Sequence, residues 1–181
     1  MGCEAFSADA GDRMRQPEFL TPVAQAQETG LELYWLGAEF TADDAVFQIS
    51  GNTQLIERDG APPGLVWYYG MRKPAGGAEA IVQVHADGGG GDEAAREALK
   101  RVRGATSKSV QVGPWEGLLY SLPAGTRPVN QYWLFVDVGA TVAIVRVPSG
   151  DTGIPGQDSN PLLDPELLID VVVENLRPYP D

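Results

Sequence analysis

The sequence predicts an α+β fold, built from a mostly antiparallel sheet with two helices packed on one face. Two observations carry this prediction. Short runs rich in Val, Ile and aromatic residues are separated by Gly and Pro turns, which is typical of strands joined as hairpins. Two longer segments instead show apolar residues at three- and four-residue spacing, which indicates helices. We expect about six to eight strands in a single domain.

The first 30 residues look different from the rest of the chain. They are polar, rich in Ala and Gln, and show no sustained apolar period. We expect an N-terminal tether over residues 1–30 that is partly disordered, with its last third able to pack on the domain through residues such as Phe19 and Val23. Residues 31–181 are expected to form one α+β domain.

The first half of that domain contains four apolar runs and then a helical pattern. The expected strands cover residues 31–37, 45–50, 65–71 and 78–86. The expected helix covers residues 92–103, with Asp92 as its N-cap and Gly104 as its stop.

The second half repeats this order. Its expected strands cover residues 109–112, 117–122, 132–138 and 142–147. The last helix is expected to begin at Asp164, an N-cap followed by Pro165, and to end before Pro178.

The two halves also share a short sequence. The segments 80–84 (AIVQV) and 143–147 (AIVRV) match at four of five positions, and each follows a strand with a paired Trp and Tyr. An internal duplication of a strand-rich unit that ends in a helix would explain this match, although Val- and Ile-rich hairpins also resemble one another by composition alone.

Charge and composition restrict the function. The formal net charge is −12, which repels nucleic acid, so we expect no nucleic-acid partner. The single cysteine, Cys3, rules out an intramolecular disulfide.

Cys3 follows directly on Gly2, as a lipid-modified cysteine follows a small residue at the end of a bacterial lipobox. In this respect the chain resembles small uncharacterised lipoproteins of bacterial envelopes. The resemblance implies lipidation at Cys3, attachment to a membrane through that lipid, and a location in the cell envelope outside the cytoplasm. N-myristoylation at Gly2, a reactive thiol and a cysteine without a role are the alternatives.

No catalytic constellation is recognisable, and we expect no metal and no cofactor. His85 is the only histidine, so it lacks the partners of a zinc site or a triad. The glycines at 88–91 open onto a helix but are followed by Asp92 and Glu93, which repel phosphate. Two carboxylates remote in sequence remain an alternative, as in a hydrolase of envelope glycans.

Large aromatic residues on the predicted strands suggest a binding surface, whose candidate residues are Trp35, Trp67, Tyr69 and Trp133. Neighbours on a strand point to opposite faces, so these rings reach both faces of the sheet, where they are either buried or exposed as a platform. The leading interpretation is a non-enzymatic module that binds an unknown protein or glycan. A structural accessory subunit is a further alternative.

Four basic residues lie in the second half of the first expected helix: Arg96, Lys100, Arg101 and Arg103. They fit either stabilisation of the helix dipole or a docking patch for a partner.

Overall fold

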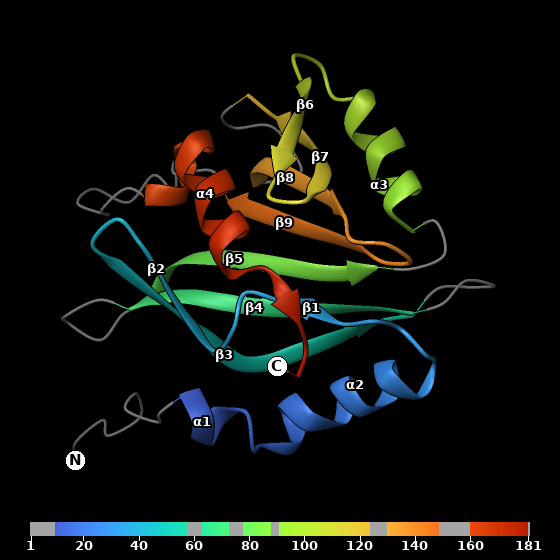
Figure 1. Ribbon diagram of the computed structural model, residues 1–181, viewed down its shortest axis with the longest axis vertical. Coiled ribbons are helices and arrows are strands. Elements are labelled where there is room, and N and C mark those ends of the chain that lie inside the picture. Colours follow the sequence, from blue (N-terminus) through green and yellow to red (C-terminus); the bar gives the residue numbers. More distant parts are fainter. Residues whose placement is uncertain are drawn as a thin grey trace.

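A computed structural model gives the fold of the protein (Figure 1). It describes residues 10–57, 63–72, 78–87, 91–123, 130–148 and 160–180. For residues 72, 78–87, 91 and 130 it describes the backbone only. The expected lipidation site Cys3 and the loop glycines 88–90 lie outside the described residues, as does the side chain of His85.

The expected α+β class is confirmed. Eight strands form one antiparallel sheet in the order β2-β3-β4-β5-β9-β8-β7-β6. Their bounds are β2 Glu39–Ala42, β3 Ala45–Ile56, β4 Gly64–Arg72, β5 Ala78–Asp87, β6 Thr106–Val112, β7 Trp115–Ser121, β8 Asn130–Asp137 and β9 Val142–Pro148. The run expected as a strand over residues 31–37 contributes only β1, Tyr34–Trp35, which pairs with β10, Arg177–Pro178, in a separate two-stranded sheet.

The expected tether is wrong for residues 10–28, which form helices. These are α1, Ala10–Arg13, and α2, Pro17–Glu28. Pro17 stands at the start of α2, where its missing N–H costs nothing, and Phe19, Val23 and Ala26 follow at helical spacing. All three are buried, so α2 is part of the domain core.

The C-terminal helix begins as expected. Pro165 starts α4, Pro165–Asn175, after a short 3₁₀ helix at Pro161–Leu163. The side chain of Asp164 accepts a hydrogen bond from the backbone N–H of Glu166 at 3.0 Å, which makes it the N-cap. By contrast, α3 spans Gly91–Lys100, so Asp92 lies inside the first turn instead of capping the helix.

The helices do not share one face of the sheet, contrary to expectation. Leu134 and Val136 of β8 join the core that contains Phe19 of α2 and Leu168 of α4. The alternate residues Trp133 and Phe135 form a second cluster with Leu99 of α3. Because alternate strand residues point to opposite faces, α2 and α4 cover one face and α3 covers the other. We call these the inner and the outer face.

The strands of the two halves have the same topology, whereas the helix that follows them does not repeat as the possible duplication of a hairpin-helix unit would require. Strands β2 to β5 and β6 to β9 are both four-stranded meanders followed by a helix, and they join through the antiparallel pair β5 and β9. Gln83 lies opposite Arg146, its equivalent in the matched segments, which places an approximate twofold axis at this pair. The turns at Asp43 and Gly113 are also equivalent, with φ of 54° and 57°. The helices depart from this symmetry, because α3 and α4 lie on opposite faces.

None of the described helices combines the length and the hydropathy that a bilayer-spanning segment needs.

Candidate binding site

The four aromatic residues expected at a binding surface are buried. Trp67 and Tyr69 are 0% exposed, Trp35 is 4% exposed and Trp133 is 6% exposed. The interpretation of these side chains as an exposed platform is therefore wrong. Strand alternation predicts that large rings reach both faces of the sheet, but it does not reveal what covers each face.

Trp67 and Tyr69 hold the segment around β1 against the inner face. The indole N–H of Trp67 donates to the carbonyl of Tyr34 at 2.8 Å. The hydroxyl of Tyr69 accepts from the backbone N–H of Leu36 and donates to the carbonyl of Gly37, both at 3.0 Å. These buried polar groups are thus paired, and they fix the backbone of a segment that has only two residues in a strand.

Gly37 is required by this arrangement. Its φ is +83°, and a Cβ at this position would lie 2.4 Å from Nη2 of Arg177 in β10. A larger residue would strain the backbone and displace that side chain.

Behind β1 and β10 lies an aromatic cluster centred on Tyr179. The Tyr179 ring meets Trp35 edge-on, with centroids 4.8 Å apart, and it lies 5.1 Å from the Trp67 ring. Its backbone N–H donates to the carbonyl of Leu33 at 2.8 Å. Tyr34 is held in turn by an edge contact with Trp115, at 6.3 Å. Both tyrosines are half-buried, but their rings pack on different neighbours, because Tyr34 and Tyr179 point to opposite sides of the two-stranded sheet.

These tyrosines line an open pocket of about 270 Å³ between the end of α2 and the two-stranded sheet. The lining residues are Gln27, Leu31, Glu32, Leu33, Tyr34, Pro178 and Tyr179. Burial raises the pKa of the Tyr179 phenol above its ordinary value, so its hydroxyl stays protonated. The exposed Gln27 and Glu32 add an amide and a carboxylate at the rim. The pocket therefore combines apolar residues with an amide and a carboxylate at its rim.

Trp133 lies on the opposite face and takes no part in this pocket. The guanidinium of Arg146 stacks over its ring, with Cζ 3.8 Å from the centroid. The indole N–H of Trp133 is buried and has no hydrogen-bond partner within the described part of the chain.

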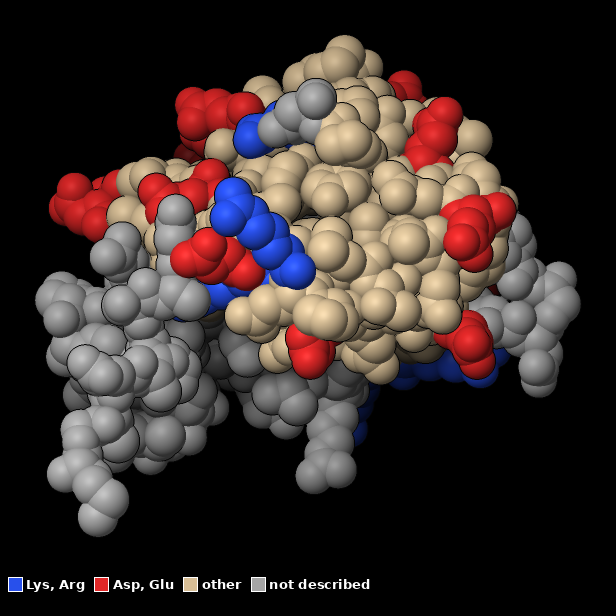
Figure 2. Space-filling view, turned by 90° about the horizontal axis from the view of Figure 1, so that it is seen from below, with Lys and Arg blue, Asp and Glu red and all other residues tan. Residues whose placement is uncertain are grey.

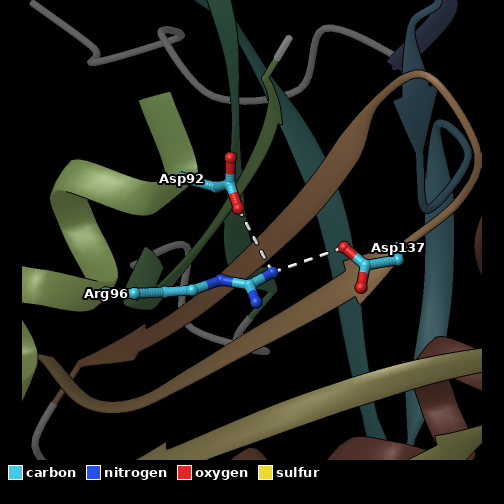
Figure 3. Close-up of polar contacts among 3 residues, drawn as sticks. All are labelled: Asp92, Arg96 and Asp137. Atoms are coloured by element: carbon cyan, nitrogen blue, oxygen red, sulfur yellow. Dashed lines mark hydrogen bonds and ion pairs between the residues drawn. The ribbon is translucent and has the colours of Figure 1, made fainter. Parts of the chain in front are cut away.

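One pair of carboxylates comes together on a single arginine (Figure 3). Nη2 of Arg96 in α3 lies 3.2 Å from Asp92 and 3.3 Å from Asp137 at the end of β8. The same guanidinium lies 4.9 Å from the centroid of the Phe135 ring. This arrangement fastens α3 to the outer face, and the arginine fills the space between the two carboxylates. Among the residues that the structure describes, no three His, Cys, Asp or Glu side chains gather to hold a metal ion.

The pocket residues Tyr34 and Tyr179 were not expected as ligand contacts. Tyr34 was visible as the neighbour of Trp35, and strand alternation predicts that the two point apart. Tyr179 lies between two prolines, which predicts extended backbone after the helix but not its pairing with a segment more than 100 residues earlier.

Comparisons with models of protein families, with curated proteins and with solved structures find no match.

Proposed function

We propose that the protein is a binding module of the bacterial cell envelope, anchored outside the cytoplasm by a lipid on Cys3. The observation that carries the binding role is the pocket at β1 and β10. The buried aromatic cluster holds the Tyr179 ring and, through the Trp67 indole, the backbone of Tyr34, so little conformational freedom is lost when a ligand binds.

The chemistry of the pocket fits a glycan or an extended protein segment. Leu31, Pro178 and Tyr179 provide apolar surface, while Gln27 and Glu32 provide donors and acceptors for ligand hydroxyl or amide groups. Its volume of about 270 Å³ lies just below the roughly 300 Å³ at which small-molecule pockets begin, so it suits at most one sugar ring or one large side chain.

The position of α1 supports attachment through Cys3. Ala10 of α1 is buried, and Arg13 donates to the carbonyl of Ile49 at 3.2 Å, so the helix is fixed to β3. About seven residues link Cys3 to Ala10 and span at most about 25 Å. A lipid on Cys3 therefore holds the domain close to the membrane.

The side of the molecule that carries α1 and α2 also suits a membrane-facing position. Figure 2 shows that uncharged residues occupy most of the middle of this view and that acidic residues lie mainly near its margin. On α2, the exposed residues between Glu18 and Glu28 are uncharged, and Leu20 is 46% exposed. This limits the repulsion between an acidic protein and anionic lipids.

Titration with soluble glycans tests the binding role. Chitooligosaccharides and peptidoglycan fragments are added to the domain, and amide shifts are followed by NMR. We expect saturable shifts at Tyr34 and Tyr179, and binding about tenfold weaker for Glu32→Lys, because a charge-assisted hydrogen bond is lost.

Glu93→Lys makes the same charge change on α3, beyond the sheet, and is the matched control. Equal weakening by both variants would indicate a general charge effect. Shifts confined to residues outside the pocket would contradict the proposed site. A panel of envelope peptides is tested in the same way, because the pocket chemistry also fits a protein segment.

A further inference from the structure

One edge of the eight-stranded sheet is formed by β6, and this edge is exposed over part of its length. Among the described residues, β6 is the last strand in the sheet order, and its one partner strand is β7. The two-residue turn Gly113–Pro114 sets the register, with Val112 opposite Trp115. In such a hairpin the residues that flank the turn exchange hydrogen bonds, and every second residue along the strand then faces away from the partner.

The outward-facing backbone groups are therefore those of Ser107, Ser109 and Gln111. None of them pairs with another backbone group among the described residues. Thr106, Ser107, Lys108 and Ser109 are all exposed. The apolar end of the strand, at Val112, is in the inner core with α4, and the exposed part of the edge precedes it. Such a row of backbone donors and acceptors is a template for an added strand.

The chain segment that contains this edge is basic, although the protein is strongly acidic. Between residues 98 and 115 there are four cations, Lys100, Arg101, Arg103 and Lys108, and no Asp or Glu. Lys100 is paired with Glu97 at 2.5 Å. Within the described residues, Arg101, Arg103 and Lys108 have no ion pair, and all three are exposed. The nearest acidic residue along the hairpin is Glu116, opposite Gln111.

We propose that the β6 edge is a docking site for an acidic, extended segment of a partner protein, which adds to the sheet as a ninth strand. Backbone hydrogen bonds would supply the affinity, as in other cases of strand addition, and the basic residues beside the edge would select an acidic sequence. The same charges disfavour pairing of β6 with the β6 edge of a second copy, because like charges would then meet. This site is independent of the pocket and of Cys3.

A dye-labelled nine-residue peptide of alternating threonine and glutamate is the probe, and fluorescence anisotropy is the readout. We expect it to bind at least about tenfold more tightly than the same peptide with lysine in place of glutamate, with an affinity that falls as salt is added. The double variant Arg103→Glu, Lys108→Glu should remove this preference.

Backbone pairing is tested with Ser109→Pro, which removes one outward N–H at a position where an edge strand tolerates proline. Ser109→Ala keeps the N–H and is the control. A peptide N-methylated at alternate residues gives the same test on the unaltered protein. We expect loss of binding with Ser109→Pro and with the N-methylated peptide, and unchanged binding with Ser109→Ala.

The proposal is overturned if the glutamate peptide does not bind, or if its binding survives both backbone changes. It is also overturned if sedimentation of the protein alone shows a dimer that Ser109→Pro abolishes, since the occupant would then be a second copy.

Discussion

Trp67 and Tyr69 illustrate how the largest side chains of this protein are used. Both are fully buried, yet each places its polar atom against the backbone near β1. They position the backbone of Tyr34, Leu36 and Gly37 beside the pocket, and they do not line the pocket themselves. The candidate site could thus be predicted only in part: Trp35, Trp67 and Tyr69, which the sequence singles out, support the pocket without lining it.

Tyr179 gives a pH-dependent prediction at the residue scale. Burial raises its pKa above the ordinary value of 10.0, so the unfolded chain loses this proton at a lower pH than the folded protein does. The stabilising contribution is complete below about pH 10 and is lost as the pH rises through the raised pKa. We expect Tyr179→Phe to reduce the loss of stability above pH 10, measured by urea denaturation.

The control for this experiment is the same pair of proteins at pH 8, where both have a neutral ring. The phenylalanine variant keeps the ring contacts with Trp35 and Trp67. Identical declines of the two proteins between pH 9 and pH 12 would contradict the burial of this phenol.

At the scale of elements, the central question is whether α2 is part of the core or belongs to a tether. Phe19 is fully buried and its ring lies 5.5 Å from that of Trp67, whereas its neighbour Leu20 is 46% exposed. We expect Phe19→Ala to lower the free energy of unfolding by about 3 to 5 kcal/mol and Leu20→Ala to change it by less than about 0.5 kcal/mol. Chemical denaturation measures both, and a small effect of Phe19→Ala would mean that α2 is not docked.

The attachment of α3 depends on Arg96. It contacts Asp92, Asp137 and the Phe135 ring while remaining 25% exposed, so solvent screens part of its charge. We expect Arg96→Met to cost about 1 to 2 kcal/mol and to increase hydrogen exchange in α3. Arg101→Met removes an exposed arginine just after the same helix and should do neither. Unchanged exchange in both variants would show that the arginine does not fasten the helix.

For the molecule as a whole, local patterns predict the elements better than their arrangement. The eight-stranded sheet follows from Val-, Ile- and aromatic-rich runs with turn residues between them, and α4 from its cap at Asp164. The pairing of β1 with β10 has no local signal, because it joins the two ends of the domain. Strand alternation alone does not specify which face of the sheet each helix covers. That choice depends on the connecting loops and on the need to bury both sheet faces.

The approximate twofold symmetry also operates at this scale. Segments 80–84 and 143–147 meet in the centre of the sheet, so the match in sequence falls on the strands that join the halves. The proposed sites lie where the halves differ. β1 and β10 have no counterparts in the repeated unit, and the turn after β2 has the acidic pair Asp43 and Asp44 where the turn after β6 has Gly113 and Pro114.

The measurement that tests the central claim most directly is palmitate labelling of the full-length protein in its own cells, with Cys3→Ala as the control. An envelope lipoprotein will carry label that depends on Cys3 and will be recovered in the membrane fraction. Absence of label, or label that persists in Cys3→Ala, would contradict the proposed lipid anchor and the location outside the cytoplasm that depends on it.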